Sequence, residues 1–78
     1  MSRITLYGRQ GCHLCDDARS VVSKVTGELG LGFTETDVDT DPELRGEYGD
    51  RVPVLLIDGV EHGYGRIDPA RLRRALTT

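Results

Sequence analysis

The chain has two cysteines, Cys12 and Cys15, and they stand only three residues apart, between a run typical of a β-strand and a run typical of a helix. A disulfide between them would close a ring around His13 and Leu14 alone. Such a small ring hardly constrains the unfolded chain and adds little stability. The fold must therefore depend on a hydrophobic core, and the cysteine pair is more typical of redox or metal chemistry than of a structural crosslink.

The core must be small, because a chain of 78 residues buries only about 60% of the surface that its unfolded form exposes. We expect one domain over residues 1–78. The longest apolar run, residues 52–57, is too short to span a membrane, and residues 1–5 lack the apolar segment of a signal peptide. We therefore expect a cytoplasmic protein without a membrane partner.

The charge balance narrows the class of partner. The chain has thirteen acidic and ten basic side chains, which give a net charge of −3. Nucleic acid is an unsuitable partner for such a chain, because phosphate binding needs a basic face. The pattern shows no exposed apolar stripe that would indicate a subunit interface, and we expect a monomer.

In the first half of the chain, residues 3–7 alternate like a strand, and a helical pattern of apolar residues begins at His13. The apolar positions of this helix are Leu14, Ala18, Val21, Val22, Val25 and Leu29. Residues 33–38 have β-propensity but little apolar content. They are therefore predicted to form an edge strand.

In the second half, Asp41-Pro42 is typical of a helix start, and a short helix is expected to about Tyr48. Residues 52–57 predict a buried strand, which the Asp58-Gly59 turn joins to a strand at residues 60–62. Asp68-Pro69 begins the last helix. The order β-α-β-α-β-β-α, with a right-handed parallel crossover and an antiparallel hairpin, predicts an α/β fold with a mixed four-stranded sheet.

The position of the cysteines suggests different roles for the two thiols. Two residues at this spacing at a helix start have Cα atoms roughly 5 Å apart, within disulfide reach. Cys12 precedes the helix, where free backbone N–H groups and the helix dipole favour a thiolate, and Arg9 adds positive charge nearby. Cys15 lies one turn inside and should be more buried. We expect Cys12 to attack a disulfide and Cys15 to resolve the mixed disulfide.

Zinc binding is the chemical alternative. A structural zinc site takes four ligands, and Cys12, Cys15 and His62 would supply three, provided that the fold brings His62 near. His13 is interpreted instead as a solvent-facing residue that modulates the thiolate. The dithiol interpretation is favoured, with no metal site.

Three segments of the chain, residues 7–15, 37–44 and 51–54, resemble the glutaredoxin family, and in particular short bacterial glutaredoxin-like proteins with a variable C-x-x-C motif. Here the motif reads Cys12-His13-Leu14-Cys15. The resemblance covers nearly the whole chain. It implies a thioredoxin fold with strand order 2-1-3-4 and a cis peptide bond before Pro53, facing the cysteines.

The resemblance also implies substrate contacts. The backbone of Val52 would pair with a bound thiol substrate, and Arg9 would contact the glycyl carboxylate of glutathione. The candidate substrate-binding residues are Arg9, His13, Leu14, Val52 and Pro53.

The electron donor stays open, because the chain departs from the motifs of family members that use glutathione. Those members have Cys-Pro-Tyr-Cys, Thr-Val-Pro, and a Gly-Gly pair followed by two acidic residues; here Arg51 precedes Val-Pro, and Asp68 is accounted for as a helix cap. The donor is therefore glutathione, another low-molecular-weight thiol or a thioredoxin-reductase-like enzyme, with no tightly bound cofactor. The competing hypothesis is a non-catalytic thioredoxin-like binding module, or a carrier that holds an iron–sulfur cluster through Cys12. The presence of Cys15 favours catalysis.

Overall fold

The computed structural model of the chain describes residues 3–77. Its elements are β1 (Ile4–Gly8), α1 (His13–Glu28), β2 (Thr34–Asp37), the 3₁₀ helix η1 (Val38–Thr40), α2 (Pro42–Tyr48), β3 (Val54–Ile57), β4 (Val60–Tyr64) and α3 (Pro69–Thr77). The predictions for residues 1–5 and for a domain over residues 1–78 include positions 1, 2 and 78, which lie outside the described residues.

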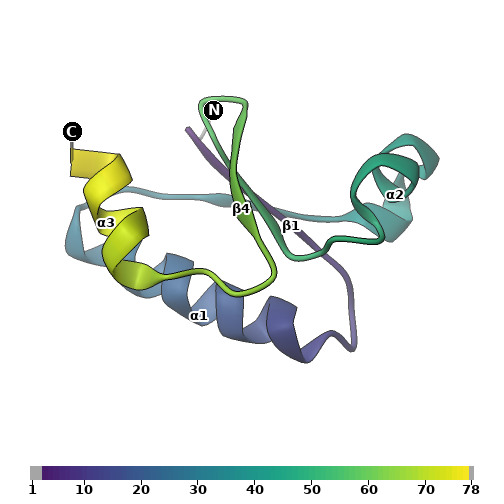
Figure 1. The fold of residues 1–78 in the computed structure, drawn as a ribbon, viewed down its shortest axis with the longest axis horizontal. Helices are drawn as coiled ribbons and strands as arrows, with labels where there is room; N and C mark the ends of the chain where they lie inside the picture. The colour runs from purple at the N-terminus through teal and green to yellow at the C-terminus, as the bar shows by residue number, and fades with distance from the viewer. Residues whose placement is uncertain (1–2, 78) are drawn as a thin grey trace.

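The four strands form one mixed sheet in the order β2-β1-β3-β4, which confirms the predicted topology. β1 pairs with β2 in parallel, and the β1–β3 and β3–β4 pairs are antiparallel. Figure 1 shows α1 and α3 together on one side of the sheet, with α2 apart from them. The fold is therefore an α/β thioredoxin fold.

The core lies between the sheet and the pair α1 and α3. β1 alternates between buried and partly exposed residues, because successive side chains of a strand point to opposite faces. The cluster of buried apolar residues consists of Ile4, Leu6, Ala18, Val22, Val25, Leu55, Ile67, Leu72 and Leu76. Only β1 and β3 supply its strand residues, so the two central strands carry the sheet's share of the core.

The helix starts follow the predicted capping residues. The Asp41 carboxylate accepts the backbone N–H of Glu43 at 2.9 Å, and the Asp68 carboxylate accepts that of Ala70 at 2.9 Å. Each aspartate thus satisfies an N–H group that the first helical turn leaves unpaired.

All four strands have boundaries that differ from the prediction by one or two residues, and β1 lies at Ile4–Gly8 rather than residues 3–7. β2 ends at Asp37 rather than residue 38, because the Asp37 carboxylate accepts the backbone N–H of Asp39 and turns the chain into η1, where Val38 is fully buried. β3 begins at Val54, since Val52 and Pro53 form a cis peptide bond before it. β4 extends two residues beyond the predicted end, to Tyr64. Among the helices described, none is long and apolar enough to cross a membrane.

Candidate active site

Cys12 is the N-cap residue of α1. Its backbone is extended, with φ −101° and ψ 112°, and its Sγ accepts the backbone N–H of Cys15 at 3.2 Å. The sulfur thus receives a backbone donor at the N-terminal end of α1. Cys12 is half-buried and therefore open to a partner, as the sequence pattern predicts.

Cys15 is buried, with 1% of its surface exposed. Burial, and then the hydrogen bond to Cys12, raise the pKa of the Cys15 thiol to about 11, while the backbone of Arg9 acts in the opposite direction. Cys15 is thus a protonated thiol at neutral pH. The two cysteines are both free thiols, one accessible and one enclosed, which is the asymmetry expected from their places in the helix.

Gly8, at the end of β1, lies directly against Cys15. A Cβ atom added to Gly8 would stand 3.3 Å from the Cys15 Sγ and 3.4 Å from its Cβ. The sequence did not single out Gly8, because a glycine after a strand is most simply explained by a turn. Its position shows that the backbone approaches the Cys15 thiol closely.

The two residues between the cysteines are exposed. His13 begins α1, and Leu14 is 41% exposed. Leu14 lies at the edge of an open hollow of about 640 Å³ between α1 and the segment that leads into α3. The other lining residues are Asp17, Ala18, Ser20, Val21, Arg66, Ile67, Asp68 and Pro69. This hollow adjoins the first turn of α1 and offers space beside the cysteine motif.

Val52 and Pro53 lie at the same edge of the sheet as the cysteine loop. Tyr7 pairs with Val54 in the antiparallel register, so the loop after β1 and the segment before β3 leave the sheet together. The Val52–Pro53 peptide bond is cis, as the family resemblance implied. Pro53 is buried, and its carbonyl oxygen accepts the backbone N–H of Gly65 at 2.8 Å.

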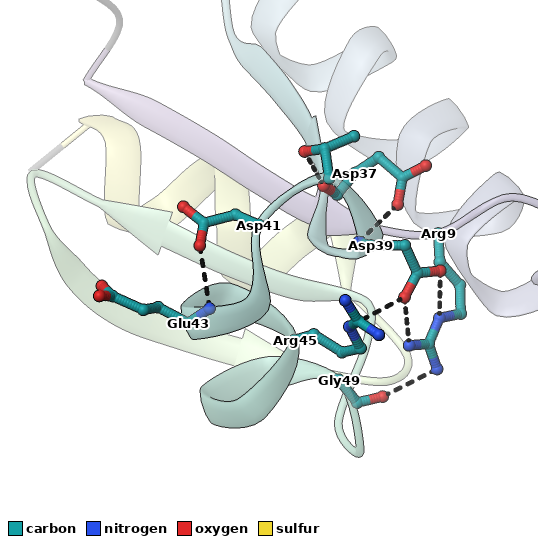
Figure 2. Close-up of polar contacts among 8 residues, drawn as sticks. Arg9, Asp37, Asp39, Asp41, Glu43, Arg45 and Gly49 are labelled. Carbon is teal, nitrogen blue, oxygen red and sulfur yellow. Dashed lines mark hydrogen bonds and ion pairs between the residues drawn. The ribbon is translucent and has the colours of Figure 1, made fainter.

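Arg9 is already engaged within the chain. Its guanidinium donates two hydrogen bonds to the Asp39 carboxylate, at 2.9 and 3.2 Å, and a third to the carbonyl oxygen of Gly49 at 3.2 Å (Figure 2). The bond to Arg9 lowers the pKa of the Asp39 carboxyl below its ordinary value. The resemblance implied that Arg9 contacts a glutathione carboxylate. In the structure, the Arg9 guanidinium is bonded to the Asp39 carboxylate.

His62 lies on β4, half-buried, beside a shallow hollow lined by Arg71, Arg74 and Ala75. Burial, and then the charge of Arg71, lower the pKa of His62. Within residues 3–77, no three His, Cys, Asp or Glu side chains are placed to hold one metal ion. The zinc alternative therefore lacks the ligand set that it required.

The sheet order and the cysteine pair at the start of α1 define a thioredoxin-fold protein. A glutaredoxin (grx-1) from Archaeoglobus fulgidus has the same fold, with a TM-score of 0.68 at 15% identity, over 100% of this chain and 89% of that one. The chain belongs to the family described as "Glutaredoxin-like domain (DUF836)", whose model matches residues 3–77.

Two relatives lie closer in sequence. "Uncharacterized protein Rv0508" of Mycobacterium tuberculosis is 41% identical over 80 residues, which cover 94% of this chain and 82% of that protein. The X-ray structure of target protein XcR50 from X. campestris is 36% identical, with a TM-score of 0.78, over 94% of this chain and 93% of that one. Both matches extend over nearly the whole chain, in agreement with the extent of the family model.

Proposed function

We propose that the protein is a glutaredoxin-like thiol–disulfide oxidoreductase that reduces protein or low-molecular-weight disulfides through Cys12 and Cys15. One observation carries the proposal: the accessible Cys12 Sγ accepts the backbone N–H of Cys15 at the helix start, while the Cys15 thiol is buried. A nucleophile that a partner can reach, with an enclosed second thiol one turn away, is the arrangement that dithiol exchange requires. The fold and the family are compatible with a thiol redox role.

The exchange has two steps. The Cys12 thiolate attacks one sulfur of the substrate disulfide; the substrate S–S bond breaks, a mixed disulfide forms, and the departing sulfur takes up a proton. Cys15 then loses its proton and attacks the Cys12 sulfur, which releases the second substrate thiol. Two electrons pass from the dithiol to the substrate, and the protein is left with a Cys12–Cys15 disulfide.

The protonation state of Cys15 fits its place in this sequence. A thiol with a pKa of about 11 does not compete with Cys12 for the first attack at neutral pH. It must give up its proton only when the mixed disulfide has formed. By then Cys12 carries no negative charge, so one of the influences that raise the pKa of Cys15 has been removed.

The disulfide left on the protein must be reduced by a donor thiol. Glutathione, another low-molecular-weight thiol and a thioredoxin-reductase-like enzyme are the three candidate donors, and each supplies two electrons per cycle. Such a dithiol works in a reducing compartment, and we place it in the cytoplasm. We expect a monomer with no tightly bound cofactor.

The substrate is proposed to lie between the residues that separate the cysteines and the Val52–Pro53 segment. His13 and Leu14 offer exposed surface on one side, and the backbone before the cis bond borders the other. Arg9 could receive a carboxylate of glutathione only if that carboxylate displaced Asp39.

Trapping of the mixed disulfide tests the proposal. Reduced Cys15→Ser protein mixed with oxidised glutathione should form a stable adduct of one glutathione on Cys12, detected by intact mass and peptide mapping. Cys12→Ser protein, with its remaining thiol buried, should form none under the same conditions. Equal adducts on both variants, or none on either, would contradict the assignment and leave the non-catalytic binding module as the better account.

A further inference from the structure

The segment from η1 through α2 has a weak apolar attachment to the rest of the fold. Val38 at its beginning is fully buried, but α2 itself has no buried residue. At its far end, the ring of Tyr48 stacks on the ring of Tyr7, with centroids 4.7 Å apart and planes inclined by 17°. Besides this stack and the partly buried Leu44, polar contacts hold α2 in its position.

Arg9 supplies those contacts at both ends of the segment. Its Nε and Nη2 donate to the two carboxylate oxygens of Asp39 in η1, and its Nη1 donates to the carbonyl of Gly49, just after α2. Figure 2 shows the guanidinium between these two groups, with Arg45 on the other side of the Asp39 carboxylate at 3.9 Å. This geometry uses the planar fork of arginine, which lysine cannot reproduce.

The backbone at Gly49 has little freedom to adjust. Gly49 is buried, and a Cβ atom there would collide with the carbonyl oxygen of Arg45. The Gly49 N–H donates to that same oxygen at 2.9 Å, and the Arg51 N–H donates to the Tyr48 carbonyl at 2.9 Å. A short hydrogen-bonded turn therefore links the Gly49 carbonyl to the residues before Pro53.

The two chain segments that Arg9 joins both border the candidate active site. Arg9 stands three residues before Cys12, and Gly49 four residues before Pro53. We propose that Arg9 is a positioning residue: its fork, held by Asp39 and Gly49, fixes the cysteine loop relative to the segment that ends in the cis bond, and so sets the groove that holds a substrate disulfide. This inference rests on the proposed function, because the groove matters only if a disulfide is bound there.

Two other roles for Arg9 lead to different results. If its charge alone supported the Cys12 thiolate, Arg9→Lys would retain full activity. If it only bound an anionic substrate, neither Arg9→Lys nor Asp39→Asn would slow the reduction of an uncharged disulfide. If Arg9 instead acts as a clamp, bonded to Asp39 and Gly49 as described above, either change slows the reaction, since each removes bonds between the same two segments.

The test measures single-turnover reduction of bis(2-hydroxyethyl) disulfide, which is uncharged and cannot bind Arg9 as an anion. Arg9→Lys and Asp39→Asn should each slow the reaction about tenfold, because a small misplacement of reacting groups is costly. The double variant should be no slower than the slower single variant, since both changes break one network. Alkylation of Cys12 by iodoacetamide, which needs no groove, should change less than about twofold if the thiolate is untouched.

Glu28→Gln is the matched control. It breaks the Arg73–Glu28 ion pair, which has a 3.0 Å contact and is exposed to a degree close to that of the Arg9–Asp39 pair, but connects α1 with α3 away from the cysteines. This variant should keep the wild-type rate. Wild-type rates in Arg9→Lys or in Asp39→Asn would overturn the clamp.

Amide hydrogen exchange separates failure of the clamp from failure of the proposed function. If the wild-type protein reduces no disulfide, the function fails, and the clamp is judged on exchange alone. Faster exchange at Gly49 and Arg51 in Asp39→Asn, with no change in α1, would support it. Unchanged exchange at those amides would overturn it.

Discussion

Replacement of Gly8 by alanine tests how closely β1 approaches the buried Cys15 thiol. The new methyl group would stand 3.3 Å from the Cys15 Sγ, and Cys15 is only 1% exposed, so the sulfur has little room to retreat. Overpacking of this kind costs about 1–3 kcal/mol. Alanine in place of glycine within a strand returns about 0.5–1 kcal/mol. We therefore expect Gly8→Ala to lower the free energy of unfolding by about 1 kcal/mol, the difference between the midpoints of these ranges, and by at most about 2.5 kcal/mol.

Urea unfolding of the reduced protein measures this effect in two backgrounds. In Cys15→Ala protein the sulfur is absent, and the same change at Gly8 should be neutral or slightly stabilising. The coupling between the two sites should then be about 1–3 kcal/mol, the overpacking term alone, because the backbone term is common to both backgrounds. Gly27→Ala is the control, because a Cβ at that exposed position of α1 meets nothing within 4 Å. Alanine should stabilise the helix there. An equal loss at Gly8 in both backgrounds would refute the proposed contact with Cys15.

Three further predictions follow from burial and ionisation. At neutral pH, iodoacetamide should label Cys12 and leave Cys15 unmodified in the folded, reduced protein, and peptide mapping that finds both labelled at equal rates would contradict the burial of Cys15. The Cys15 thiol has an ordinary pKa of 9.0 and a folded pKa of about 11, so the unfolded chain loses this proton first, and stability should fall as pH rises from about 9 to 11. Urea unfolding across that pH range should show a larger fall in the free energy of unfolding for wild-type protein than for Cys15→Ala protein. The same pH dependence in both proteins would contradict this prediction. Leu72 of α3 is fully buried, and its replacement by alanine should lower the free energy of unfolding by about 2–5 kcal/mol. Thermal unfolding measures this loss, and Leu14→Ala, at an exposed position, is the control that should lower it much less.

Much of the fold could be predicted because turn and capping residues lie next to the elements that they begin or join. The Asp58-Gly59 turn and the handedness of the first crossover indicated a mixed four-stranded sheet, while its strand order came from the family resemblance. Asp41 and Asp68 marked two helix starts. Val38 was assigned to a strand on its β-propensity. Its place in η1 depends on the Asp37 side chain, which redirects the backbone, and propensity does not report such a competing hydrogen bond.

The candidate site was predictable only where its residues are neighbours in the chain. Cys12 and Cys15 define each other by their spacing, and their different burial follows from their positions at the helix start. The partners of Arg9 lie 30 and 40 residues away, and a charge pattern does not reveal which carboxylate or carbonyl will reach a guanidinium. The cis bond before Pro53 came from the family resemblance rather than from local chemistry.

Intact-mass measurement of the protein across glutathione redox buffers tests the central claim most directly. Wild-type protein should lose two hydrogen atoms reversibly at a potential between about −270 and −180 mV, the range from thioredoxin to protein disulfide isomerase. Cys12→Ser protein should not, and a glutathione adduct on Cys12 at intermediate potentials would further support glutathione as a reaction partner. A wild-type mass that does not change across the whole range would contradict dithiol exchange through Cys12 and Cys15.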